Sequence, residues 1–407
     1  MQNRIPARAI WALGLTQILG YGTLYYSFGV LAPAIGREFG WSPEWVYGAL
    51  TIALLAGGLS APVAGHLADR FGAARTMAVG SVVVAATLVA LAIAPNGPAF
   101  AVALVAMEIT AGLVLYATAF AALVQASGQE GQRSITHLTL IAGFASTLFW
   151  PLTSLLLTQV DWRSVYLIFA GLNLLCCAPL HFWLSRLPRQ AAALPGPDDA
   201  VATKPAAGAL SGRHRSVGFG LMMLGFAIEG FILSAILMQI IPLLTGLGLG
   251  GGALLVTSLF GPAQVLSRLG TMVLGRNQPA ARVALTAAVL LPLGALVLAV
   301  TAPMLPGAVL FAVLFGLGSG LLSIVSGSLP LELLGRENYG SRLGWLSSAR
   351  QTASAVAPFC LALLMGVFGA VGALWAIAAL GLVAILTFLV IALMPGFSAA
   401  AETAPAL

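Results

Sequence analysis

The sequence has little charge and few cysteines. Only 7% of its 407 residues are Asp, Glu, Lys or Arg, whereas 60% are hydrophobic and the mean hydropathy is +1.01. A soluble domain does not need so much apolar surface. Cys176, Cys177 and Cys360 have neither the number nor the spacing of a disulfide framework or a zinc site. The composition excludes most soluble classes and indicates an all-α polytopic membrane protein.

Long apolar runs occupy most of the chain. Since a spanning helix takes roughly 20 apolar residues, the length allows about twelve spans with short loops. We place them at residues 9–33, 45–67, 75–95, 98–125, 134–159, 164–186, 217–246, 251–274, 283–303, 306–333, 342–368 and 371–394. The segment between the two sets is rich in proline and charge and is interpreted as a flexible linker. We therefore predict a six-helix bundle at 1–186, a cytoplasmic linker at 187–216 and a second six-helix bundle at 217–407.

The 18 basic residues indicate how the chain is oriented. With the N-terminus in the cytoplasm, only Arg37 and Arg163 fall in outer segments and Arg350 lies within a span. All other Lys and Arg residues fall in or near cytoplasmic segments, as expected because basic residues are retained there during insertion. We predict a multi-pass protein of the bacterial inner membrane with both termini in the cytoplasm. The net charge of +6 is then an orientation signal and not a nucleic-acid-binding patch.

A charged, glycine-containing loop follows the second predicted span. It reads Gly65-His66-Leu67-Ala68-Asp69-Arg70-Phe71-Gly72-Ala73-Ala74-Arg75. The loop resembles the signature G-x-L-x-D-R-x-G-x-x-x of the major facilitator superfamily, with Arg75 as a trailing basic residue. Glycines permit close helix approach and a tight turn, and the Asp69 carboxylate can meet a helix N-terminus or an arginine. The resemblance implies that Gly65, Asp69, Arg70, Gly72 and Arg75 form a gating loop that does not select substrate.

Other segments carry a weaker resemblance. Residues 268–276, the corresponding loop after the eighth predicted span, lack the aspartate. The strings Glu38-Phe39-Gly40-Trp41-Ser42 and Asp161-Trp162-Arg163 resemble the monocarboxylate-porter-like branch of the superfamily. Membership implies two six-helix bundles around a central cavity lined by the first, fourth, seventh and tenth spans. It also implies alternating access to a site near the membrane midplane.

Two acidic residues lie inside predicted spans, where a charge is expensive and therefore indicates function. Glu108 in the fourth span and Glu229 in the seventh fall near the midplane, at a rise of roughly 1.5 Å per residue. We predict that they bind and release protons during transport. The alternative is that each only fixes helix packing. At Glu108, drug-proton antiporters of the superfamily carry an arginine, so their motif is absent.

Arginine, amide and tyrosine side chains complete the candidate site. Arg268 follows Gln264 by one helical turn, a spacing at which monocarboxylate porters have a substrate-binding arginine after an aspartate. The resemblance implies a substrate or gating role for Arg268, unless its side chain extends to the lipid headgroups. Arg350 is expected to pair with Glu332 or Glu229, or to bind an anion. Residues expected to shape the cavity are Gln17, Tyr21, Tyr25 and Tyr116.

These features predict a proton-coupled secondary transporter of a small solute, and not an enzyme. Two acids in the membrane favour proton-antiport efflux of a drug or metalloid, whereas Arg268 and Arg350 favour symport of a small organic anion. Both remain open, and a non-transporting membrane sensor is a third reading. No nucleotide-binding loop or metal-ligand spacing is present. We expect a monomer whose partners are substrate, protons and membrane lipid, with no cofactor, metal or nucleic acid.

Overall fold

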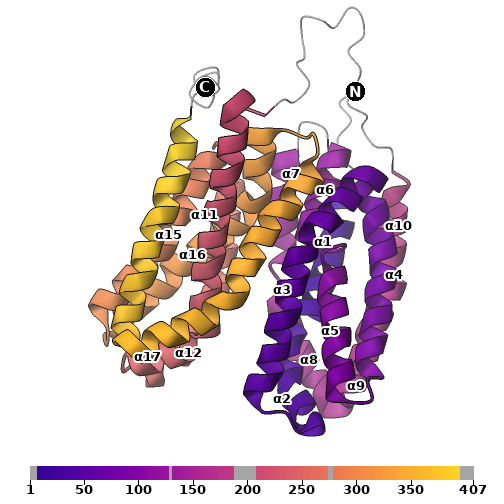
Figure 1. Ribbon diagram of the computed structural model, residues 1–407, viewed down its shortest axis with the longest axis horizontal. Coiled ribbons are helices and arrows are strands. Elements are labelled where there is room, and N and C mark those ends of the chain that lie inside the picture. Colours follow the sequence, from indigo (N-terminus) through magenta and orange to yellow (C-terminus); the bar gives the residue numbers. More distant parts are fainter. Residues whose placement is uncertain (1–6, 128–130, 188–207, 274–277, 395–407) are drawn as a thin grey trace, which may run out of the picture. The chain divides into compact units, whose positions relative to one another are not determined.

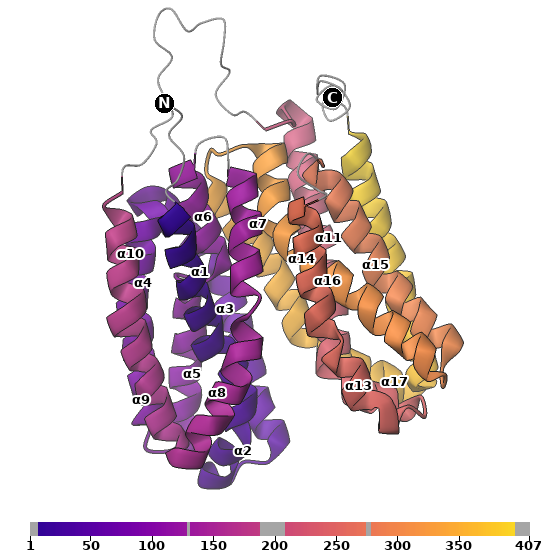
Figure 2. The same ribbon diagram turned by 180° about the vertical axis from the view of Figure 1, so that it is seen from behind.

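The computed structural model describes residues 7–127, 131–187, 208–273 and 278–394. These residues form helices and turns, with no β-strand among them (Figures 1 and 2). The chain divides into two compact units, of which the first comprises Met1–Ala206 and Arg336–Ser348. The second comprises Ala207–Gly335 and Ala349–Leu407. The segment Arg336–Ser348 therefore belongs to the first unit despite its late position in the sequence.

The first unit is built from short and long helices joined by π-helical segments. Its helices are α1 (Ala7–Tyr21), α2 (Ser27–Phe39), α3 (Pro43–Leu67), α4 (Ala73–Ala92), α5 (Gly97–Ala111), α6 (Tyr116–Ser127), α7 (Gly131–Ala142), α8 (Ala145–Gln159), α9 (Trp162–Leu172) and α10 (Ala178–Ser185). The π-helical segments are η1 (Gly22–Tyr26), η2 (Ala68–Gly72) and η4 (Asn173–Cys177).

The second unit holds the remaining helices. They are α11 (Gly212–Met238), α12 (Ile240–Gly246), α13 (Ala253–Ser258), α14 (Phe260–Val273), α15 (Ala280–Thr301), α16 (Leu305–Leu334) and α17 (Tyr339–Leu393), with the short 3-10 turn η5 (Gly250–Gly252). The first residues of α17 belong to the first unit. Most of the predicted linker, residues 188–207, lies outside the described residues. The helix α11 begins at Gly212, before the predicted apolar run, and Arg215 in its first turns donates to the carbonyl of Leu334 over 3.0 Å.

Nine stretches of described residues are long and apolar enough to cross a membrane. Two of them, Pro43–Ala92 and Tyr339–Leu393, contain 50 and 55 residues, whereas one crossing takes roughly 20. Each contains a glycine with positive φ, Gly72 at 93° or Gly369 at 70°, and so covers two of the predicted spans. The predicted span 251–274 is divided between α13 and α14, which shortens both pieces. The all-α polytopic fold predicted from composition is confirmed.

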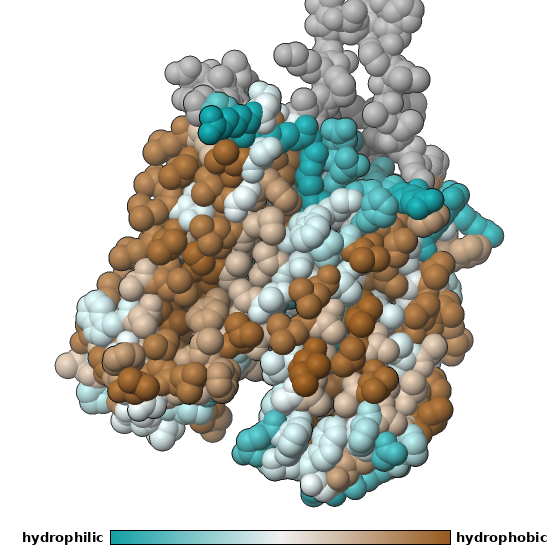
Figure 3. Space-filling view, in the orientation of Figure 1, coloured by the Kyte–Doolittle hydropathy of each residue, from teal (hydrophilic) through white to brown (hydrophobic). Residues whose placement is uncertain are grey.

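The outer surface of each unit is apolar. Leu175, Leu254 and Leu393 are 74%, 81% and 74% exposed. In Figure 3, brown hydrophobic side chains cover the flanks of each unit and teal hydrophilic side chains gather toward the helix ends. Exposed apolar surface of this extent requires a cover, and lipid supplies it in a membrane.

Regular helix stops inside the first unit between α5 and α6, at residues 112–115. The side-chain amide of Gln17 donates to the carbonyl of Val114 over 2.8 Å, and the Thr118 hydroxyl donates to the carbonyl of Gly112 over 2.8 Å. Since the bilayer core has no water, carbonyls released by such a break need partners within the protein. The break lies beside η1, because the rings of Tyr21 and Tyr116 are 4.5 Å apart.

Candidate functional site

The predicted gating loop places its acidic side chain at the start of another helix. Asp69, in η2, accepts hydrogen bonds from the backbone N–H of Gly340 (2.9 Å), the backbone N–H of Ser341 (2.7 Å) and the Ser341 hydroxyl (2.7 Å). Gly340 and Ser341 belong to the first turn of α17. A carboxylate there meets both the unpaired N–H groups and the positive end of the helix dipole. Of the two partners expected for Asp69, the structure places the helix N-terminus beside it.

Glycines make this close approach possible. A Cβ on Gly65 would lie 2.2 Å from the carbonyl oxygen of Gly340, and one on Gly344 would lie 2.6 Å from that of Ala61. Gly72 has a φ of 93°, which favours glycine. The start of α17 can therefore contact α3 backbone to backbone. Any longer side chain at these positions would separate the two helices and lengthen the hydrogen bonds to Asp69.

The two basic residues of the loop are exposed and lie apart from these contacts. The Arg70 guanidinium lies 5.2 Å from the ring centroid of Phe71, and Arg75 lines a surface cavity with residues of α10. In the degenerate second copy of the loop, Arg276 falls outside the described residues.

Glu108 is buried within the first unit. It lies on α5, is 8% exposed, and a Cβ on Gly57 of α3 would lie 2.8 Å from its carbonyl oxygen. No hydrogen bond or ion pair of its carboxyl group to another described residue is found. The close helix contact explains the burial, and the carboxyl group is left without a hydrogen-bond or ion-pair partner in the part of the chain that the structure describes.

Glu229 is buried more completely, within the second unit. It lies on α11, is 0% exposed, and neither carboxyl oxygen has a hydrogen-bond partner among the described residues. Its neighbour Gly230 packs against α17, where a Cβ would lie 2.5 Å from Cγ of Arg350. The Arg350 guanidinium forms no ion pair with a described residue, so the expected pairing with Glu229 is not formed here. Ser234 secures the same crossing by donating its hydroxyl to the carbonyl of Ser354 over 2.7 Å.

The arginine of α14 is also buried. Arg268 is 6% exposed, and its Nε donates to the hydroxyl of Ser323 on α16 over 3.1 Å. Its Nη1 is buried and has no hydrogen-bond partner among the described residues. One turn earlier, Gln264 donates its amide to the hydroxyl of Ser319 over 3.1 Å. The side chain therefore stays inside the second unit and does not extend to the headgroups, and hydroxyl and amide groups are its polar surroundings.

Tyrosines gather where α1 passes into η1. Tyr21 lies 6.5 Å from Tyr25 and 4.5 Å from Tyr116 of α6, measured between ring centroids. Gln17, one turn before Tyr21, is fully buried, and its side-chain oxygen has no partner among the described residues. The four predicted residues thus lie around one interruption of the helices. Such π-helical segments and broken membrane helices are common at binding sites.

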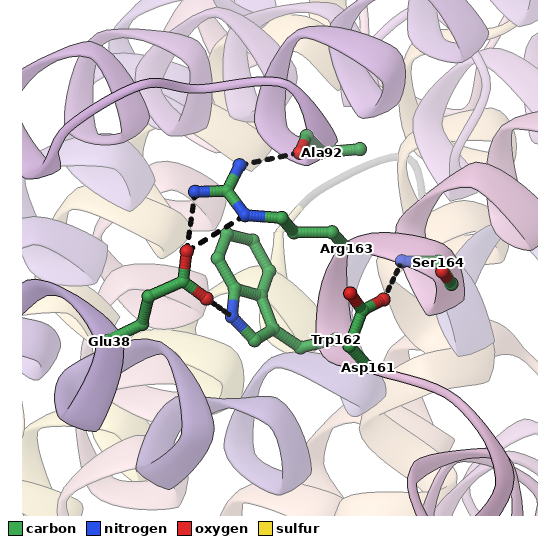
Figure 4. Close-up of polar contacts among 6 residues, drawn as sticks. All are labelled: Glu38, Ala92, Asp161, Trp162, Arg163 and Ser164. Carbon is green, nitrogen blue, oxygen red and sulfur yellow. Dashed lines mark hydrogen bonds and ion pairs between the residues drawn. The ribbon is translucent and has the colours of Figure 1, made fainter.

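A further polar cluster joins the ends of α2, α4 and α9 (Figure 4). Both carboxyl oxygens of Glu38 are used, one by Arg163 at 2.7 and 2.9 Å and the other by the indole N–H of Trp162 at 2.5 Å. Arg163 also donates to the carbonyl of Ala92 over 2.6 Å. The contacts hold three helix ends together. They bring together two sequence strings that were singled out only by their resemblance to known transporters.

Several partners were missed from sequence. Ser319, Ser323, Gly340 and Ser341 are small residues common in any membrane helix, so nothing in their pattern distinguished them. Val114 contributes a backbone carbonyl, which no side-chain motif reports. Among the described residues, no group of three or more His, Cys, Asp or Glu side chains is placed to hold a metal ion.

A model of the Major Facilitator Superfamily matches residues 13–305. The chain belongs to this superfamily. No curated protein matches the sequence. Solved structures similar to this superfamily member include the human organic anion transporter MFSD10 (TETRAN), with a TM-score of 0.71, 17% identity and coverage of 95% of this chain and 100% of that one.

Two further solved superfamily structures have similar folds. The proton:xylose symporter XylE, bound to 6-bromo-6-deoxy-D-glucose, gives a TM-score of 0.68 at 14% identity, covering 94% of this chain and 95% of that one. FucP in the outward conformation gives a TM-score of 0.70 at 14% identity, covering 93% of this chain and 97% of that one. At these identities the likeness concerns the fold alone. Together with the family match, it makes the protein a multi-pass secondary transporter of the superfamily and not an enzyme.

Proposed function

We propose that this superfamily member is a proton-coupled symporter of a small organic anion in the bacterial inner membrane. The observation that carries the proposal is the burial of Arg268 with its Nη1 unpartnered among the described residues. Placing an unpaired charge at the centre of the bilayer costs about 2.5–3.5 kcal/mol on insertion scales. Binding an anion recovers that cost, which favours a substrate that brings a negative charge.

The groups around Arg268 suit an oxyanion. A guanidinium presents a planar fork of donors that matches a carboxylate. The Ser319 hydroxyl and the Gln264 amide add neutral donors, and no carboxylate of a described residue occupies the guanidinium. A cationic substrate would gain nothing from these groups.

Glu229 supplies a means of proton coupling within the same unit. When Glu229 is ionised, its charge compensates that of Arg268 and repels an anion. When it is protonated, the compensation is removed and the affinity of Arg268 for an anion rises. Because such coupling is reciprocal, bound anion favours bound proton. The two therefore move together, and the site need not pass through a state of large net charge.

The remaining predicted residues have supporting roles in the proposed cycle. We assign gating to the loop that contains Asp69, and substrate contact to the tyrosines near Gln17. The proposed working parts are the bundles 1–186 and 217–407, joined by the cytoplasmic linker 187–216, with both termini in the cytoplasm and the monomer as the functional state.

A second candidate is proton-antiport efflux of a drug or metalloid. The burial of Glu108, whose carboxyl group has no hydrogen bond or ion pair to a described residue, favours it, since a second acid provides another proton carrier.

Proteoliposomes that enclose a pH-sensitive dye separate these candidates. A panel of hydrophilic carboxylates, cationic drugs and arsenite is added outside, and the signal of protein-free liposomes is subtracted. Symport predicts acidification of the lumen with a carboxylate, loss of that signal in Arg268→Gln and partial retention in Arg268→Lys. The matched control Arg282→Gln, which removes an exposed arginine of the same unit, should behave as wild type. Alkalinisation with a drug or arsenite that persists in Arg268→Gln would overturn symport and establish antiport.

A further inference from the structure

Two arginines of the first unit line a surface cavity of about 530 Å³. Arg75 lies in the first turn of α4, and Arg186 directly follows the last residue of α10, with Phe182, Ser185 and Leu187 completing the wall. The helices α4 and α10 pack against each other and run side by side in both views (Figures 1 and 2). Their arginine-bearing ends meet at the same end of the unit, where the sequence predicts the cytoplasmic surface.

Arg186 and the neighbouring Arg8 have aromatic partners, and no acidic partner of either is found among the described residues. The Arg186 guanidinium lies 4.3 Å from the ring centroid of Phe182, and that of Arg8 lies 5.8 Å from the ring of the adjacent Trp183. Neither these arginines nor Arg75 donates a guanidinium hydrogen bond to a described residue. Stacking on a ring fixes the direction of a guanidinium while it leaves the N–H groups available. The cavity therefore presents oriented donors and positive charge.

Exposed apolar side chains continue from each arginine along the helices. On α4, Val79 and Val82 follow Arg75 at the spacing of one helix face and are 64% and 49% exposed. On the other helix, Phe182 precedes Arg186 by one turn and is 52% exposed, and Leu175 in η4 is 74% exposed. A polar, positively charged head region thus joins a two-helix apolar stripe.

We propose that the α4–α10 end is a binding site for an anionic phospholipid, with the phosphate held by Arg75 and Arg186 and the acyl chains along the apolar stripe. Basic pockets at the cytoplasmic border of membrane helices attract acidic headgroups, and guanidinium groups bind phosphate by paired hydrogen bonds. The adjoining stripe selects a lipid over free phosphate, because a free ion gains nothing from Val79 or Phe182. Arg75 also ends the predicted gating loop, but the site contains neither Arg268 nor Glu229, so the assignment does not rest on the proposed symport and is tested by lipid binding alone.

Native mass spectrometry of the full chain in detergent, titrated with dioleoyl phosphatidylglycerol or dioleoyl phosphatidylcholine, tests the assignment. Phosphatidylglycerol should bind more tightly, and Arg75→Gln and Arg186→Gln should each weaken it roughly fivefold, at about 1 kcal/mol per arginine. The double variant should lose preference for the anionic lipid. Arg133→Gln combined with Arg282→Gln removes two other exposed arginines and should bind as wild type.

Free anions provide the second arm of the test. Inorganic phosphate and glycerol phosphate, added at the concentration that saturates with lipid, should not compete for the site. Equal binding of the anionic and zwitterionic lipids would overturn the proposal, as would equal losses in the site and control double variants. Competition by inorganic phosphate as strong as that by lipid would reassign the cavity to a soluble phosphate ligand.

Discussion

Two acidic side chains, one in each unit, differ in how their surroundings satisfy them. Asp69 in the first unit accepts hydrogen bonds from two backbone N–H groups and a hydroxyl. Glu229 in the second is fully buried, and neither oxygen has a described partner. A satisfied carboxylate stabilises one arrangement of helices, whereas an unsatisfied one costs free energy and is retained for what it does. The contrast separates a carboxylate that stabilises one arrangement of the helices from one that we expect to bind and release a proton.

Buried polar atoms without a described partner occur in both units. In the first unit they include the Gln17 amide oxygen, Nε2 of His181 and Nη2 of Arg336. In the second they include both carboxyl oxygens of Glu229 and Nη1 of Arg268. We propose that proton coupling takes place in the second unit because the fully buried Glu229 and the anion-binding Arg268 lie in that unit, and that the first unit supplies gating and part of the substrate surface.

The largest expected effect compares Asp69→Ala with Glu229→Leu. Loss of Asp69 removes a charged acceptor from three donors and should lower the free energy of unfolding by at least about 2 kcal/mol. Loss of Glu229 removes a bare buried charge, so stability should stay the same or rise. Thermal unfolding of the purified variants in detergent measures both. Equal destabilisation would show that the two carboxylates are alike and break the comparison.

An effect of intermediate size is expected from a second pair of buried polar side chains, Asn173 and Arg268. Asn173, 1% exposed, donates to the Thr23 hydroxyl over 3.0 Å and to the Phe169 carbonyl over 2.9 Å. Asn173→Leu should cost about 1–2 kcal/mol of unfolding free energy, whereas Arg268→Met should cost none. Thermal unfolding in the same detergent is the measurement. If Arg268→Met is the less stable variant, then Arg268 is a structural residue.

A smaller effect is expected where both units use a side chain to accept a hydrogen bond from the first N–H of a helix. The first N–H of α4, at Ala73, donates to the side chain of Gln125 over 2.9 Å, and that of α15, at Ala280, donates to Glu332 over 2.7 Å. The partners are 52 residues apart in both units. Gln125→Ala and Glu332→Ala should each lower the free energy of unfolding by about 1 kcal/mol. Glu332→Gln should lose only a few tenths, since it keeps the acceptor and loses only the charge at the dipole. A full loss in Glu332→Gln would show that the units differ here too.

The smallest effect concerns Asp161, which caps α9. Its hydrogen bonds from Ser164 and the nearby charge of Arg163 hold its pKa below the ordinary value of 3.8. A lowered folded-state pKa adds stability above the unfolded-state value, and this stability is lost as the pH falls through the folded-state pKa. The difference in melting temperature between wild type and Asp161→Asn should be constant above about pH 4 and shrink below it. A difference that is unchanged at lower pH would contradict this account of the cap.

Much of the fold was predictable because apolar runs and basic residues report membrane insertion directly. Asp69 was singled out because its loop resembles the superfamily signature, and Glu229 because a charge within a membrane span is rare. Their different surroundings did not follow, because the donors to Asp69 are backbone groups of Gly340 and Ser341 about 270 residues later in the sequence. The break at residues 112–115 was likewise hidden, since it interrupts an apolar run without a proline.

The most direct test of the central claim is substrate movement in proteoliposomes that contain Glu229→Gln, with Glu108→Gln and wild type measured beside it. A transporter whose proton site is neutralised should still exchange labelled anion across the membrane but should no longer accumulate it when a pH gradient is imposed. We predict this loss of pH-driven accumulation, with exchange retained, for Glu229→Gln and not for Glu108→Gln. Full accumulation in Glu229→Gln and its loss in Glu108→Gln would contradict the account and move proton coupling to the first unit.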